Sequence, residues 1–133
     1  MASELRVNTL KDAAGNNSIA MQYVAEGTAK AYNTFDFANT AQRDSFNVST
    51  TTDRGTGSSY ANLVSAMGTA TYNTVSSSSP TAIGSMTTTN YNRAAISQPD
   101  TASRIAHNSF TTSGTGAPQD DPYTAVVAHG DLA

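Results

Sequence analysis

Cysteine is absent from this chain of 133 residues, and strongly apolar residues are scarce. Without cysteine, neither a disulfide nor a thiolate metal site can contribute, so packing and hydrogen bonds must hold the fold together. Leu, Ile, Val and Phe together supply only 19 residues, fewer than a core of this size usually contains. One copy would bury little apolar surface, and we therefore expect a homo-oligomer.

Charge is sparse as well, since only 13% of the residues are charged and the formal net charge is −3. Disordered chains combine few apolar residues with high net charge, so we expect a folded chain here. The seven basic residues stand singly, which argues against nucleic-acid binding. No apolar run approaches the ~18 residues of a membrane span, and the first residues lack the apolar core of a signal peptide, so membrane insertion is not indicated.

Ser and Thr fill the space that apolar residues leave, with 36 of the 133 positions. Thr favours strands, whereas Ser, Asn and Gly favour turns. Short extended stretches alternate with turn residues at intervals of roughly 8–15 residues, which is typical of an all-β sandwich or barrel. We expect a small antiparallel β-sandwich or barrel over residues 31–133, preceded by an extended N-terminal arm over residues 1–30.

The arm carries its apolar residues in alternation. The pattern at Ile19, Met21, Tyr23 and Ala25 predicts one extended strand. We expect the arm to form the attachment and oligomer interface through six residues. They are Leu5, Val7, Leu10, Ile19, Met21 and Tyr23.

Turn and strand signals also divide the body. Asp53 with Gly55 and Gly57 predicts a tight hairpin, and the serine run at residues 76–80 predicts a loop. The sequence is compatible with a short helix only at residues 91–96. Residues 112–122 predict an exposed tip, and alternation over residues 123–129 predicts a final strand inside the sheet.

The side chains that carry chemistry are dispersed. His107 and His129 have no cysteine near them, and Asp120 with Asp121 lacks calcium-loop spacing and predicts a solvated loop pair. Ser is abundant, but no Gly-x-Ser-x-Gly elbow surrounds one. A hydrolase of surface polysaccharide would need an acid pair that the sequence does not single out. We therefore expect no enzyme, and no catalytic residue, cofactor or metal.

Three phrases of the sequence carry a family resemblance. They are Ser-Glu-Leu-Arg-Val-Asn-Thr-Leu-Lys-Asp-Ala at residues 3–13 with Gly15-Asn16, Arg-Asp-Ser-Phe-Asn-Val-Ser at residues 43–49 leading to Asp53 and Gly55-Thr56-Gly57, and His-Gly-Asp-Leu-Ala at residues 129–133. In order and spacing they resemble short tail-fibre-like virion structural proteins of tailed bacteriophages, especially marine and cyanobacterial ones. The chain departs from the family at residues 30–35, where Tyr32 stands in place of the usual Trp, and residues 61–113 align with nothing.

The resemblance implies a trimeric β-structured module that is attached to the virion through its N-terminal arm and recognises the host. Its partners would be copies of itself, other tail or capsid proteins, and a host cell-surface glycan or protein. The alternative is a capsid decoration protein, a head fibre or cement protein that binds the shell through the same arm. Both place the chain on the tail or capsid surface of a virion.

Overall fold

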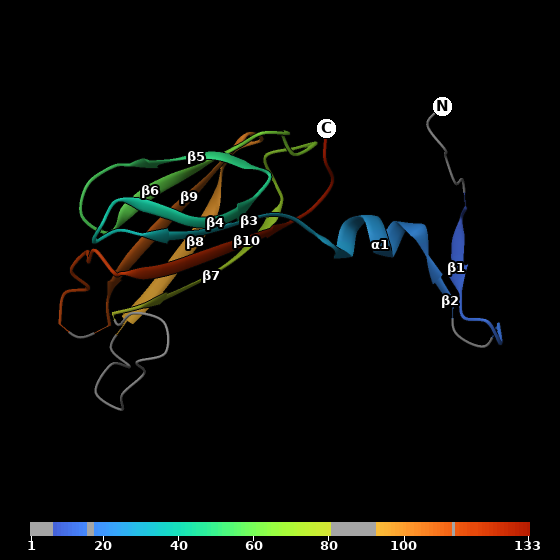
Figure 1. Ribbon diagram of the computed structural model, residues 1–133, viewed down its shortest axis with the longest axis horizontal. Helices are drawn as coiled ribbons and strands as arrows, with labels where there is room; N and C mark the ends of the chain where they lie inside the picture. The colour runs from blue at the N-terminus through green and yellow to red at the C-terminus, as the bar shows by residue number, and fades with distance from the viewer. Residues whose placement is uncertain (1–6, 16–17, 81–92, 113) are drawn as a thin grey trace.

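The computed structural model describes residues 7–15, 18–80, 93–112 and 114–133, and within them the chain is mostly antiparallel β-structure with one short helix (Figure 1). This confirms the all-β prediction. The first four-stranded sheet contains β3 (Ala29–Asp36), β4 (Ala41–Phe46), β7 (Asn73–Ser79) and β10 (Tyr123–His129), in the order β4-β3-β10-β7. The second contains β5 (Val48–Asp53), β6 (Ser58–Leu63), β8 (Arg93–Thr101) and β9 (Arg104–Thr111), in the order β5-β6-β9-β8.

The two sheets pack against each other around one apolar core. Strand alternation sends every second side chain inward, as in β10, where Val126 and Ala128 are buried between half-buried neighbours. The core takes residues from both sheets, namely Ala31, Val48, Ala61, Leu63, Met67, Tyr72, Ile105, Val126 and Ala128. The edge strands β7 and β8 lie side by side, but in the described part of the chain no ladder joins them into a closed barrel.

Polar side chains complete the interior where apolar ones are short. Asp36 is 1% exposed and accepts hydrogen bonds from the backbone and side chain of Asn39, at 3.0 and 2.8 Å, and from Arg43. Burial alone would raise the pKa of Asp36, but these hydrogen bonds and the Arg43 charge outweigh it and lower the pKa. The buried carboxylate therefore stays ionised and fixes the turn after β3.

Two turn and strand predictions are confirmed. β5 and β6 form a hairpin in which Gly55 and Gly57 have φ of 108° and 66°, a conformation that favours glycine. At Gly57 a Cβ atom would also collide with the backbone of Ser109 and Gln119. The final strand, Tyr123–His129, lies in the middle of its sheet between β3 and β7, which ties the C-terminal region down.

Two other predictions were wrong. The serine run at residues 76–79 is not a loop but most of β7, paired with β10 so that Ser76 lies opposite Val126 and Ser77 opposite Ala125. A ladder needs only backbone groups, and β10 supplies them, so tertiary pairing overrides the low strand propensity of serine. The helix admitted at residues 91–96 falls partly outside the described residues, and its residues 93–96 belong to β8.

Candidate attachment surface

The N-terminal region begins with a two-stranded hairpin that lies to one side of the two sheets (Figure 1). β1 (Thr9–Lys11) pairs with β2 (Ser18–Ala20), and Leu10 stands directly opposite Ile19. Both side chains are 43% exposed. The pairing sheet contains only these two strands, so nothing in the described chain covers this apolar pair as a second layer would.

The strand predicted at residues 19–25 was wrong, because β2 ends at Ala20 and helix α1 (Met21–Gly27) follows at once. An alternation of only four residues does not distinguish a strand from a helix, and Met and Ala favour the helix. The Met21 N–H donates to the Asn8 carbonyl at 2.9 Å, which joins the start of α1 to the hairpin.

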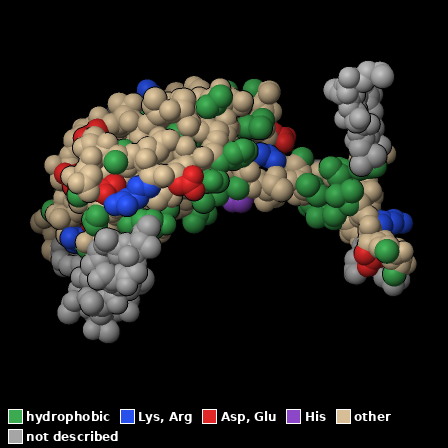
Figure 2. All heavy atoms as spheres, viewed as in Figure 1, with side chains coloured by type: hydrophobic (Ala, Val, Ile, Leu, Met, Phe, Trp, Pro, Cys, Tyr) green, Lys and Arg blue, Asp and Glu red, His purple; other side chains and the backbone are tan. Residues whose placement is uncertain are grey.

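The structure describes five of the six predicted interface residues, and Leu5 lies outside the described part. Val7, Leu10 and Ile19 are exposed, and Tyr23 on α1 is 67% exposed, whereas Met21 is half-buried. The structure brings Leu10 and Ile19 together and spreads the others along the hairpin and α1. Figure 2 shows hydrophobic side chains gathered over α1, with smaller groups of them spread over the sandwich.

The end of α1 meets the body near the last strand. The Gly27 carbonyl lies 3.3 Å from His129 Nδ1, and the Thr28 hydroxyl donates to the Val24 carbonyl at 2.9 Å. Close by, an open groove of about 500 Å³ is lined by the connection from β6 to the start of β7 and by the end of β10 with the residues after it. The lining residues include Tyr72, Asn73, His129 and Asp131.

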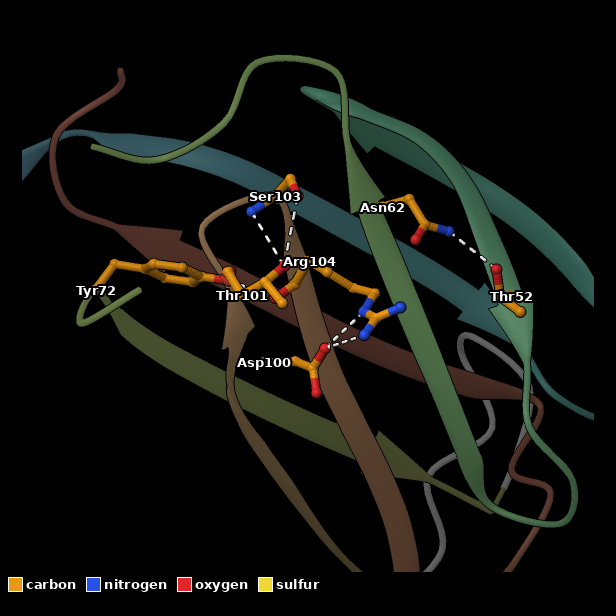
Figure 3. A network of polar contacts seen from close by, with 7 residues as sticks. All are labelled: Thr52, Asn62, Tyr72, Asp100, Thr101, Ser103 and Arg104. Atoms are coloured by element: carbon orange, nitrogen blue, oxygen red, sulfur yellow. Dashed lines mark hydrogen bonds and ion pairs between the residues drawn. The ribbon is translucent and has the colours of Figure 1, made fainter. Parts of the chain in front are cut away.

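The outer face of the sheet β5-β6-β9-β8 is polar and internally hydrogen-bonded. The Asn62 amide donates to the Thr52 hydroxyl at 2.9 Å and to the Thr50 hydroxyl at 3.1 Å, and Arg104 Nε donates to Asp100 at 2.6 Å (Figure 3). The Arg104 guanidinium also lies over the Tyr60 ring, 4.1 Å from its centroid. The polar groups of this face therefore largely satisfy one another.

Tyr72 anchors the β8–β9 turn from beneath that face (Figure 3). Its single hydroxyl proton faces two carbonyl acceptors, that of Arg104 at 2.7 Å and that of Thr101 at 3.1 Å. Burial, together with the nearby Asp100 charge, raises the pKa of Tyr72 to about 12. The phenol therefore remains a neutral donor at any physiological pH and acts as a structural strut.

One buried cluster combines the residue types of hydrolytic catalysis, but its geometry differs from that of a triad. The Ser109 hydroxyl donates directly to Asp121, whose other oxygen accepts from Arg93 Nε at 2.9 Å. His107 is 3% exposed, its Nε2 has no hydrogen-bond partner among the described residues, and burial lowers its pKa to about 4, although the Asp121 charge opposes this. Among the described residues, no hydrogen bond joins the His107 imidazole to the Ser109 hydroxyl.

The prediction of a solvated acid pair was wrong for Asp121. Its carboxylate is 1% exposed and ion-paired, while Asp120 is exposed and accepts from the Gly57 N–H at 2.6 Å. The adjacent residues thus point to different environments, one closing the interior and one bracing the β5–β6 hairpin. Nothing in the local sequence signalled this, because Arg93 and Ser109 are distant along the chain.

In the ranges that the structure covers, no three His, Asp or Glu side chains gather closely enough to hold a metal ion. The same described residues contain no helix with the length and apolar character to span a bilayer. No family model, curated protein or solved structure matches this chain.

Proposed function

We propose that this chain is a non-enzymatic structural module of a tailed-phage virion, a tail-fibre-like unit attached through its N-terminal hairpin and α1. The observation that carries the proposal is the exposure of Leu10 and Ile19 on a hairpin of two strands. Such a hairpin is only marginally stable in water by itself. Covering the two half-exposed side chains would contribute about 1 kcal/mol each, so a bound partner stabilises the hairpin as it attaches the chain.

The resemblance to phage proteins supports the same segment as the point of attachment. Its opening phrase, residues 3–13, includes β1 and therefore Leu10. The partner of the hairpin is accordingly another virion protein of the tail. We further propose that three copies of the chain associate in the particle, as the resemblance implies.

Host recognition then falls to the sandwich. The outer face of the sheet β5-β6-β9-β8 exposes the Gln98 amide, and the exposed residues 114–118 include the Thr115 hydroxyl. Groups of this kind bind glycans and polar protein surfaces through adaptable hydrogen bonds. The proposed partner at this end is a host cell-surface glycan or protein.

A capsid decoration role is the second candidate, and one observation favours it. α1 ends at Gly27 and β3 begins at Ala29, so only Thr28 separates the attachment region from the body. A body held this close to its anchor suits a cap on a shell better than a long fibre. The same hairpin would then lie on the capsid.

Cryo-electron microscopy of the intact particle, with this chain located in the density, tests both candidates. A few copies at the tail support the tail-fibre role, many copies over the shell support decoration, and absence from the particle overturns the virion assignment. Particles assembled with the variant Leu10→Asp/Ile19→Asp should lose the chain. The matched control is Val64→Asp, since Val64 is 69% exposed but lies far from the hairpin in the connection after β6.

A further inference from the structure

The outer face of the sheet β4-β3-β10-β7 carries a continuous row of large apolar side chains. The strand registers place Phe46 opposite Tyr32, Tyr32 opposite Val127, and Val127 opposite Val75, so that the row crosses all four strands. The Tyr32 and Phe46 rings are stacked with centroids 6.1 Å apart. Phe46 is 53% and Val75 66% exposed, while Tyr32 and Val127 are half-buried.

This row is unusual for a chain so poor in apolar residues. The corresponding positions on the outer face of the other sheet are Thr52, Tyr60, Ala106 and Gln98, and the Tyr60 ring there is covered by arginine. Three of the chain's 19 strongly apolar residues, Phe46, Val75 and Val127, thus lie on the solvent side of one sheet. A contiguous exposed apolar patch marks an interaction surface more often than chance.

Charge on this face is balanced. Strand alternation and register place Lys30 and Asp44 on the same side as Tyr32, one charge of each sign, although the whole chain has a net charge of −3. The Tyr32 hydroxyl donates to Asp44 at 3.4 Å. Identical surfaces that pack together must tolerate their own charges, and a face with one cation and one anion does so without like-charge repulsion.

We propose that this outer face, centred on the row Phe46-Tyr32-Val127-Val75, is the surface on which a second copy of the chain packs. The balanced charge and the shortage of apolar residues in each single copy both favour a copy of this chain over an unrelated partner. The inference rests on the proposed function only for the expectation that copies associate. It assigns their contact to the sheet rather than to the N-terminal hairpin, which stays free for the virion.

The area of the face sets the extent of the contact. Four strands of about seven residues form a plane of roughly 19 by 23 Å, which is smaller than the surface of about 800 Å² that each partner usually buries in a stable complex. Neighbouring surface must therefore join the contact.

Sedimentation velocity of the full chain over a range of concentrations, with row and control variants, tests the inference. The row variant is Phe46→Ser/Val75→Ser, and the control is Ile96→Ser, which removes a similarly exposed apolar side chain from the other sheet. We expect the unsubstituted chain and the control to be oligomeric. The row variant should be monomeric, or should associate at least about tenfold more weakly.

A monomeric unsubstituted chain, or a row variant that assembles like the control, would overturn the inference. A single cysteine gives a second readout that does not depend on the row variant folding, because the chain has no other thiol. Cysteine in Val75→Cys should be protected from alkylation in the oligomer, whereas cysteine in Ile96→Cys, on the other sheet, should react freely. Equal alkylation of the two would also contradict the contact. None of these outcomes depends on finding the chain in a particle, so the inference and the virion assignment can fail separately.

Discussion

Arg93 at the start of β8 donates a hydrogen bond of 2.9 Å to Asp121, which lies two residues before β10 of the other sheet. The Asp121 side chain is 2% exposed, and it also accepts from Ser109 on β9. The ion pair therefore holds the two sheets together at one end of the sandwich.

Replacing Asp121 should destabilise the fold, because it leaves the largely buried guanidinium of Arg93 without its partner. We expect Asp121→Asn to lower the free energy of unfolding by about 3–5 kcal/mol in urea titrations. The matched variant Asp44→Asn removes an exposed carboxylate and should change it by less than about 1 kcal/mol. Similar losses in the two variants would mean that the buried pair contributes no more than a surface charge.

His107 makes stability depend on pH. Its pKa is about 4 in the folded chain and 6.5 in an unfolded one, so between these values the unfolded state binds more protons. The contribution of His107 to the free energy of unfolding is therefore fully present above pH 6.5. It is lost as the pH drops toward 4, and the loss amounts to about 3 kcal/mol. Unfolding titrations at pH 7.5 and 4.5 measure the loss, and His107→Phe should remove most of it. An unchanged pH dependence in that variant would assign the loss to carboxylates such as Asp36.

The serine strand is tested through its backbone. A proline within β7 removes an N–H and distorts the ladder with β10, so Ser77→Pro or its neighbour Ser78→Pro should lower the free energy of unfolding by about 1–3 kcal/mol. Ser77→Ala keeps the N–H and should have little effect. Thermal unfolding of the three variants distinguishes a strand from a loop, since a loop at these residues would tolerate all three substitutions.

Asn47 combines an unusual backbone conformation with three side-chain hydrogen bonds. Its φ is 55°, its amide donates to the carbonyls of Lys30 and Ser65, both at 3.0 Å, and its Oδ1 accepts from the Ser65 N–H. Asn47→Ala should lower the free energy of unfolding by about 2 kcal/mol, through the lost bonds and the positive φ. Asn47→Gly loses the same bonds without the backbone strain, so it should be the less damaging of the two by calorimetry.

Sequence patterns predicted those elements whose signals are local. The β5–β6 hairpin follows from two closely spaced glycines. The alternations at residues 19–25 and 123–129 have the same length, and only the second became a strand, because β3 and β7 pair with it on both sides, whereas Met21–Gly27 forms a helix. The attachment residues Leu10 and Ile19 were named from their apolar character, but their position opposite each other depends on the hairpin register.

The sequence by itself determined that this chain would be built from strands, because Thr-rich segments separated by Gly, Asn and Ser turns have few other ways to satisfy their backbone groups. It also determined that the core would be small. Only the tertiary structure decided which residues share a face. The serine run became a strand because β10 offered it a ladder, and Asp121 became buried because Arg93 and Ser109 met it there. The apolar row from Phe46 to Val75 exists only through the pairing of four strands, of which only β3 and β4 are neighbours in the chain, and the long-range registers of β10 are not encoded in any short stretch of sequence.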